Sequence, residues 1–164
     1  MTKQQYEKCA KPFREHPKAF SVVKWTNRIL TFSGFVLFPV LLILLYQTDG
    51  RMMLRCLFTA GISFVLVSVI RKWIDSERPY ERMDIQPLIK KEKRGCSFPS
   101  RHVFSITVIA MCWFAYQPPV GWILIVEAVL MSIIRVIGGI HDPRDVVAGF
   151  IIGIVSGIFG LFLI

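Results

Sequence analysis

Residues 29–46 read ILTFSGFVLFPVLLILLY, an uninterrupted run of 18 residues without a charged side chain. As an α-helix, such a run would be about 27 Å long, close to the thickness of the hydrocarbon core of a bilayer. The run therefore predicts a transmembrane helix. Similar apolar runs lie at residues 56–70, 103–126 and 146–164. The shortest of them, residues 56–70, is flanked by arginines that can reach the membrane surface from its ends.

The run at residues 103–126 is interrupted by Gln117-Pro118-Pro119. Because a double proline stops an α-helix, we expect two helices there, at about residues 101–116 and 119–138. The sequence thus predicts an all-α fold, a polytopic membrane bundle of about five transmembrane helices in the cell membrane. The composition agrees, since 54% of the residues are hydrophobic and the mean hydropathy is +0.53. Such apolar content excludes an intrinsically disordered chain.

The first 28 residues have a different character. They hold seven basic residues, the prolines Pro12 and Pro17, and scattered aromatic side chains. This composition is typical of a broken amphipathic helix on the membrane surface, and a solvated basic tail is the alternative. We therefore divide the chain into an interfacial basic segment, residues 1–28, and a membrane-embedded domain, residues 29–164. Residues 74–100 form the long polar loop of this domain, and loops of that length usually carry function.

Charge and cysteine content restrict the classes of partner. Twenty Lys and Arg residues against eleven Asp and Glu give a net charge of +9. In a membrane protein we expect this charge to attract anionic lipids or a phosphate substrate rather than nucleic acid. Four cysteines without a Cys-x-x-Cys pair predict neither a disulfide framework nor a zinc site.

Ionisable side chains gather at the ends of the predicted spans. If the five spans alternate across the membrane, the end of the second, the start of the third, the end of the fourth and the start of the fifth share one face. The residues at these four places are Arg71 and Arg78; Ser100, Arg101 and His102; Arg135 and His141; and Asp145. Ionisable residues at such depth are costly and usually functional. Glu127 lies apart, inside the fourth span, and could be protonated, pair with Arg51 or Arg55, or contact a substrate.

The convergent set suits chemistry on a phosphate group. Guanidinium groups bind phosphate oxygens in pairs. One imidazole can attack phosphorus, another can protonate the leaving oxygen, and a carboxylate can hold the attacking ring in the required tautomer. Asp142 is a predicted N-cap with Pro143 in the first turn of the last helix, so that His141 lies at a helix N-terminus, which attracts anions.

The spacing of these residues resembles that of the type 2 phosphatidic acid phosphatases. The three motifs of that family are Lys, six residues, Arg-Pro; then Pro-Ser-Gly-His; then Ser-Arg, five residues, His, three residues, Asp. At the same spacings this chain has Arg71 and Arg78-Pro79, then Pro99-Ser100-Arg101-His102, then Arg135, His141 and Asp145.

The chain departs from the family pattern at three motif positions. Arg71 stands where the family has Lys, Arg101 replaces Gly, and Ile134 replaces the Ser before Arg135. The family bundle usually has six spans, whereas five are predicted here. The surface segment, residues 1–28, takes the place of the missing one.

The resemblance implies a role for each matching residue. His141 would be the nucleophile that forms a phosphohistidine, oriented by Asp145, and His102 would be the general acid for the leaving group. The implied phosphate ligands are Arg71, Arg78, Ser100, Arg101 and Arg135. Members of the family need no metal, and we expect no cofactor.

The implied function is that of an integral membrane lipid phosphatase, a hydrolase that removes the terminal phosphate of a lipid phosphate or diphosphate. A polyprenyl diphosphate such as undecaprenyl diphosphate is the favoured substrate. Phosphatidylglycerophosphate, phosphatidic acid and a lipid A phosphate are the alternatives. Two other classes stay open, an anion transporter whose pore the arginines line and a non-catalytic lipid-binding protein. No oligomeric state follows from the sequence.

Two arguments disagree about which side of the membrane the site faces. Of the 20 basic residues, 18 lie on the side of the predicted site, and only Arg51 and Arg55 lie opposite. The positive-inside rule therefore favours a cytoplasmic site. Bacterial relatives that the chain resembles mostly act on the outer face, where lipid carriers are recycled. We expect the extracytoplasmic face, because the availability of substrate decides where such an enzyme can act.

Overall fold

The computed structural model describes residues 1–89 and 94–163, and this part of the chain contains seven α-helices and no β-strand. The helices are α1 (Lys3–Glu15), α2 (Pro17–Thr48), α3 (Gly50–Ile74), α4 (Pro79–Arg82), α5 (Arg101–Tyr116), α6 (Pro118–Ile137) and α7 (Pro143–Ile158), which continues into a π-helical turn, Phe159–Leu163. Residues 90–93 of the predicted polar loop, and Ile164 at the end of the predicted last span, lie outside the described residues.

Four of these helices are long and apolar enough to cross a membrane, namely α2, α3, α6 and α7 with its π-helical turn. α5 is a shorter apolar helix of 16 residues. Together the five helices match the five predicted spans, so that the predicted polytopic helical bundle is confirmed. The break expected at the double proline is present as well, since Gln117 alone separates α5 from α6.

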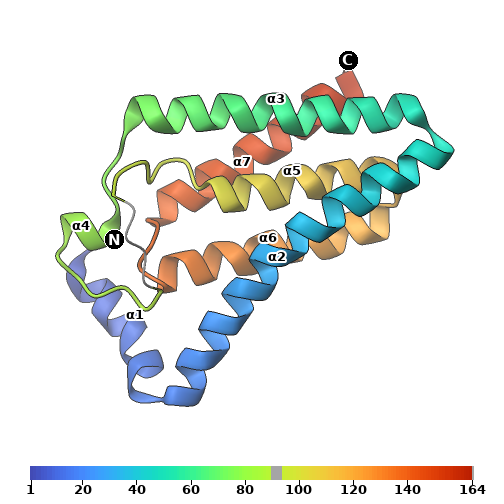
Figure 1. Cartoon of the computed structure of the whole chain (residues 1–164). Coiled ribbons are helices and arrows are strands. Elements are labelled where there is room, and N and C mark those ends of the chain that lie inside the picture. The colour runs from blue at the N-terminus through green and yellow to red at the C-terminus, as the bar shows by residue number, and fades with distance from the viewer. Residues whose placement is uncertain (90–93, 164) are drawn as a thin grey trace.

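α5 is the central helix of the bundle (Figure 1). It packs against α2, α3, α6 and α7, and its side chains Phe104, Val108 and Trp113 are buried. The surrounding helices instead expose large apolar side chains, among them Phe35 and Trp122. An apolar outer surface of this extent is suited to lipid rather than to water.

α7 approaches α5 closely because glycines line its contact face. A Cβ atom on Gly149 would lie 2.5 Å from the carbonyl oxygen of Ser100, and one on Gly153 would lie 2.6 Å from the Cβ of Thr107. Small residues of this kind allow membrane helices to approach each other. The N-terminus of α7 therefore lies beside that of α5, where the Ser100 N–H donates to the carbonyl oxygen of Asp145 at 2.8 Å.

α2 begins at Pro17 and runs to Thr48 as one helix of 32 residues. The predicted boundary after residue 28 therefore falls inside a helix. Proline is tolerated in the first turn of a helix, and Pro17 takes that position in α2. The break between α1 and α2 is therefore at His16, whereas Pro12 lies within α1. The location of residues 1–28 on the membrane surface stays a prediction.

α1 packs its apolar side against the segment that follows α4. The side chain of Tyr6 is fully buried, and its hydroxyl donates to the carbonyl oxygen of Gln86 and accepts from the Leu88 N–H, each at 3.2 Å. Ala10 is buried in the same cluster, with Ile85. α1 is thus held against the loop that leads to the site, while its lysines are exposed.

Glu127 lies in the middle of α6 and accepts a hydrogen bond from the hydroxyl of Ser33 in α2. This bond joins two helices within the bundle. No local sequence pattern indicates this partner, because the two residues lie 94 positions apart in the chain.

Candidate active site

The four predicted places meet at one end of the bundle, the end where α1 and α4 also lie (Figure 1). A pocket of about 330 Å³ opens there. It is lined mainly by basic side chains, Arg71, Lys72, Arg78, Arg101, His102 and His141, and we call it the basic pocket. Five of the eight predicted site residues therefore line one cavity. The convergence expected from alternating spans is present.

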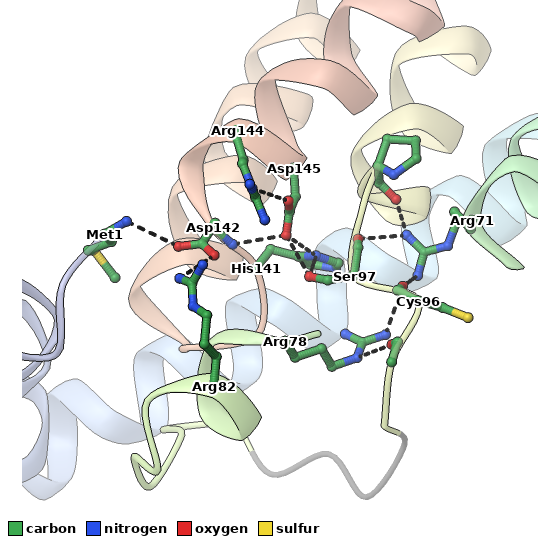
Figure 2. Close-up of polar contacts among 12 residues, drawn as sticks. Met1, Arg71, Arg78, Arg82, Cys96, Ser97, His141, Asp142, Arg144 and Asp145 are labelled. Atoms are coloured by element: carbon green, nitrogen blue, oxygen red, sulfur yellow. Dashed lines mark hydrogen bonds and ion pairs between the residues drawn. The ribbon is translucent and has the colours of Figure 1, made fainter. Parts of the chain in front are cut away.

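His141, Ser97 and Asp145 form a buried group behind the basic pocket (Figure 2). The Ser97 hydroxyl donates to Asp145 Oδ2 at 2.5 Å and lies 3.3 Å from His141 Nδ1. His141 Nδ1 and Asp145 Oδ2 are themselves 3.5 Å apart. Because Nδ1 faces Ser97 and Asp145, the other ring nitrogen, Nε2, is the one left for the pocket.

The turn between α6 and α7 fixes the position of His141. Gly139 adopts a left-handed φ of 73°, and a Cβ atom there would lie 2.8 Å from the hydroxyl oxygen of Tyr6, so that only glycine fits. The His141 N–H donates to the carbonyl oxygen of Arg135 at 3.2 Å. The Asp142 N–H donates to Asp145 Oδ2 at 3.1 Å, and α7 starts at the next residue, as the sequence predicts.

Burial lowers the pKa of His141 to about 4, and the nearby charges of Arg78 and Arg135 act in the same direction. The nearby carboxylate of Asp145 raises the pKa but does not outweigh burial. The ring is therefore neutral at physiological pH. A neutral imidazole has a lone pair on one nitrogen, which is the form that a nucleophile requires.

Arg78 and Ser100 each have one buried polar atom that makes no hydrogen bond among the described residues. Arg78 donates from Nε to the Gly95 carbonyl oxygen at 3.1 Å and from Nη2 to that of Cys96 at 3.5 Å. Within the described residues, its Nη1 atom and the Oγ atom of Ser100 have no hydrogen-bond partner. Buried polar groups are usually satisfied. Arg78 lines the basic pocket, so its Nη1 atom suits an anion bound there, whereas Ser100 is not part of the lining.

Arg71 holds the backbone of the loop before α5. Its guanidinium donates to the carbonyl oxygens of Cys96, Ser97 and Pro99, with Nη1 at 3.0 Å from that of Ser97. The side chain is buried and still lines the basic pocket. Arg71 therefore adds positive charge to the pocket while it fixes the loop that carries Ser97.

Two carboxylates bind the same loop through its N–H groups. Asp75 Oδ1 accepts from the Cys96 N–H at 3.0 Å, and Glu81 Oε1 accepts from the Gly95 N–H at 3.0 Å. Gly95 has a φ of 64° and lies so close to Asp75 that a Cβ atom would be 2.3 Å from Oδ1. The loop is thus held by cations on its carbonyl side and by carboxylates on its N–H side.

Arg135 is buried beside the basic pocket rather than in its lining. Its Nη2 donates to the hydroxyl oxygen of Thr31 at 3.1 Å, and Thr31 in turn donates to the carbonyl oxygen of Asn27 at 2.7 Å. α2 therefore contributes a hydroxyl to the site through Thr31. Ile134, which precedes Arg135, has no hydroxyl to offer.

A second cavity, of about 340 Å³, adjoins the basic pocket. It lies among α2, α3, α5 and α6, and its lining is mostly apolar, including Phe35, Phe38, Phe64, Ile106, Ile109 and Met131. Arg101 and His102 line both cavities. The Arg101 guanidinium also lies over the ring of Phe64, 5.4 Å from its centroid. A cationic pocket and an apolar cavity therefore meet at these two residues.

Sequence reasoning missed several residues at this site, above all Ser97, Thr31, Asp75 and Glu81. A weak signal existed for each of them. Ser97 lies three residues before Ser100 in a predicted motif, Thr31 is a hydroxyl within an apolar run, and the two acidic residues flank Arg78. None of these signals specifies a contact, because each contact depends on how the loop and α2 are placed in space.

Known proteins match the chain over most of its length. A family model described as PAP2 superfamily matches residues 52–163. An undecaprenyl-diphosphatase from Sulfolobus acidocaldarius is 29% identical over 140 residues, which cover 77% of this chain and 68% of that protein. The bacitracin transport permease protein BcrC of Bacillus licheniformis is 31% identical over 117 residues, which cover 68% of this chain and 56% of that protein.

Two solved structures share the fold. LpxE of Aquifex aeolicus superposes with a TM-score of 0.75 at 26% identity, over 96% of this chain and 93% of that one. The first transmembrane PAP2-type phosphatidylglycerolphosphate phosphatase from Bacillus subtilis superposes with a TM-score of 0.71 at 26% identity, over 96% of this chain and 83% of that one.

The buried, neutral His141 should make the protein sensitive to acid. Its pKa is about 4 in the folded protein against 6.5 for an ordinary histidine. As the pH falls through this range, the unfolded chain takes up a proton that the folded protein does not. The free energy of unfolding should therefore fall, by up to about 3 kcal/mol from this residue. Thermal unfolding of the detergent-purified protein across this pH range measures the effect.

The matched variants are His141→Gln and His16→Gln, since His16 is exposed between α1 and α2. His141→Gln should lose less stability than the wild type on acidification, and His16→Gln should follow the wild type. If the stability of His141→Gln falls with pH as steeply as that of the wild type, His141 is not the source of the acid sensitivity.

Proposed function

This chain belongs to the PAP2 superfamily and is a multi-pass membrane lipid phosphatase, and we propose that it removes the terminal phosphate of a polyprenyl diphosphate. The observation that carries this proposal is the junction of the basic pocket with the apolar cavity at Arg101 and His102. A phosphate head attached to one long apolar chain fits such a pair of cavities. The similarity to an undecaprenyl-diphosphatase supports undecaprenyl diphosphate as the favoured substrate.

The first step of the proposed reaction transfers the terminal phosphate to His141. Nε2 attacks the terminal phosphorus while the bond from phosphorus to the bridging oxygen breaks. His102 begins protonated and gives its proton to that oxygen, so that a lipid monophosphate leaves. The phosphohistidine carries a positive ring charge, which the carboxylate of Asp145 balances.

The second step releases inorganic phosphate. A water molecule attacks the phosphorus, and His102, now neutral, takes a proton from that water. The bond between phosphorus and Nε2 breaks as the new bond to oxygen forms, and both histidines return to their starting states. Because His102 lines both cavities, it is suited to protonate an oxygen that joins the head group to the chain.

The remaining polar residues bind the phosphate in this scheme. Arg71, Arg78 and Arg101 would supply positive charge from the lining of the basic pocket, and the buried Arg135 would add charge from beside it. Arg78 Nη1 and Ser100 Oγ would each gain the hydrogen bond they lack by contacting a phosphate oxygen.

Other lipid phosphates remain alternatives to a polyprenyl diphosphate. They are phosphatidylglycerophosphate, phosphatidic acid and a lipid A phosphate, and the structural similarity to two other lipid phosphatases supports testing them. A diacyl lipid has two chains, however, and an apolar cavity of about 340 Å³ suits one chain better. Hydrolysis rates for a panel of these lipids, measured on the purified protein, separate the substrates.

We further propose that the basic pocket faces the extracytoplasmic side, where lipid carriers are recycled. The high positive charge on that face runs against the positive-inside rule. The exposed lysines of α1 offer an explanation, because basic residues near a membrane surface bind anionic lipid head groups on either leaflet.

Replacing either histidine of the basic pocket should abolish turnover. His141→Ala removes the proposed nucleophile and His102→Ala the proton donor, and we expect phosphate release from undecaprenyl diphosphate to fall by about 10²- to 10⁴-fold. His16→Ala is the control, because His16 is exposed, and this variant should keep the wild-type rate. A His141→Ala variant with a tenth of the wild-type rate or more would contradict the assignment.

Filling the apolar cavity should slow the hydrolysis of substrates with a long chain and not that of substrates with a short chain. A Cβ atom on Gly34 would lie 3.4 Å from the Ile106 side chain, in the cavity lining. Gly34→Leu should lower hydrolysis of undecaprenyl diphosphate by about tenfold or more and leave that of isopentenyl diphosphate unchanged. Gly61→Leu is the control, because a Cβ atom at Gly61 meets nothing within 4 Å. Equal losses on both substrates would argue against a chain in this cavity.

The orientation can be tested through Cys9, which is exposed on α1. In a variant that keeps Cys9 and lacks the other three cysteines, a membrane-impermeant thiol reagent should label intact cells. The control adds a cysteine at Thr48, at the opposite end of α2, in a variant without Cys9, and this cysteine should react only after lysis. The reverse pattern would place the basic pocket in the cytoplasm.

A further inference from the structure

Ser97 lies between His141 and Asp145 and is fully buried. Its hydroxyl oxygen is 2.5 Å from Asp145 Oδ2 and 3.3 Å from His141 Nδ1. The direct separation of Nδ1 from Oδ2 is 3.5 Å, longer than an ordinary hydrogen bond. The hydroxyl is thus closer to each partner than the partners are to each other.

The closer acceptor for the proton of this hydroxyl is Asp145 Oδ2, at 2.5 Å against 3.3 Å for His141 Nδ1. A carboxylate only accepts hydrogen bonds, whereas a serine hydroxyl donates one and accepts others. When the Ser97 hydroxyl donates its hydrogen bond to Asp145, its lone pairs face Nδ1 of His141. A proton on Nδ1 can then be donated to Ser97, which gives a continuous row of hydrogen bonds from the ring to the carboxylate. Nε2 then carries the lone pair of the ring. These contacts therefore favour the tautomer of His141 that has its proton on Nδ1.

We propose that Ser97 is a positioning residue for His141. Its hydroxyl links the imidazole ring to the carboxylate of Asp145 through hydrogen bonds and holds Nδ1 in its protonated form. The proposal rests on the assignment of His141 as nucleophile under the proposed function. When the ring gains positive charge on phosphorylation, the Nδ1–H bond to Ser97 and the Ser97 bond to Asp145 both strengthen, since charged hydrogen bonds are the strong ones.

The backbone of Ser97 is held on both sides, so that its hydroxyl has a fixed place. Its N–H donates to the Ser76 carbonyl oxygen at 2.8 Å, and its carbonyl oxygen accepts from Arg71 Nη1 at 3.0 Å. Arg71 also lines the basic pocket. Ser97 therefore joins a residue of the phosphate pocket to the histidine behind it.

The test compares Ser97→Ala with Ser76→Ala, each purified in detergent and assayed with undecaprenyl diphosphate. Ser76 holds Ser97 through a backbone carbonyl, which the substitution leaves in place. Ser97→Ala should lower kcat by about 10- to 100-fold with little change in KM, and Ser76→Ala should act as the wild type. If Ser97→Ala does not fold, the near-isosteric Ser97→Cys takes its place, with a smaller loss of kcat.

A double-mutant cycle separates positioning from a merely structural role. If Ser97 acts through Asp145, adding Ser97→Ala to Asp145→Asn should cost little further activity. An undiminished loss in that background, or a wild-type kcat for Ser97→Ala, would overturn the proposal. Failure of the proposed function is a different result, because then the wild type and Ser76→Ala would release no phosphate either.

Discussion

The structure of the site depends on the hydrogen-bond acceptors available to two guanidinium groups at the end of an apolar bundle. Arg71 and Arg78 are buried, and a buried charge is stable only when hydrogen bonds replace the lost water. The carbonyl oxygens of residues 95–99 supply those bonds, three to Arg71 and two to Arg78. The loop before α5 is therefore folded around two cations, and the position of Ser97 follows from them.

The close contact of α5 with α7 then completes the site. Glycines on α7 leave room for the backbone of α5, so that the turn carrying His141 lies beside the start of α5, which carries His102. Each histidine has its own environment. His141 is buried and neutral, with its Nδ1 toward Ser97, whereas His102 lines both the basic pocket and the apolar cavity. These environments suit the proposed roles of His141 as the nucleophile and His102 as the proton donor.

Much of the fold could be predicted because apolar runs and prolines act locally. The five spans, the break at Pro118 and the helix start at Pro143 follow from such features. The alternation of the five spans also predicted that the arginines and histidines converge, since alternate span ends return to the same face. The Ser97 bridge, the bond from Arg135 to Thr31 and the docking of Tyr6 could not be predicted in this way. Each joins residues at least 44 positions apart, and each depends on loop geometry that no local pattern encodes.

In the proposed reaction, the terminal phosphate passes to Nε2 of His141. The most direct measurement uses His102→Ala with p-nitrophenyl phosphate labelled on phosphorus, because this leaving group departs without a proton and the second step then lacks its base. Mass spectrometry of the digested protein at alkaline pH locates the label. We expect a phosphate on His141, and none on a variant that also carries His141→Ala. A phosphate on another residue, or p-nitrophenol release without any labelled protein, would contradict it.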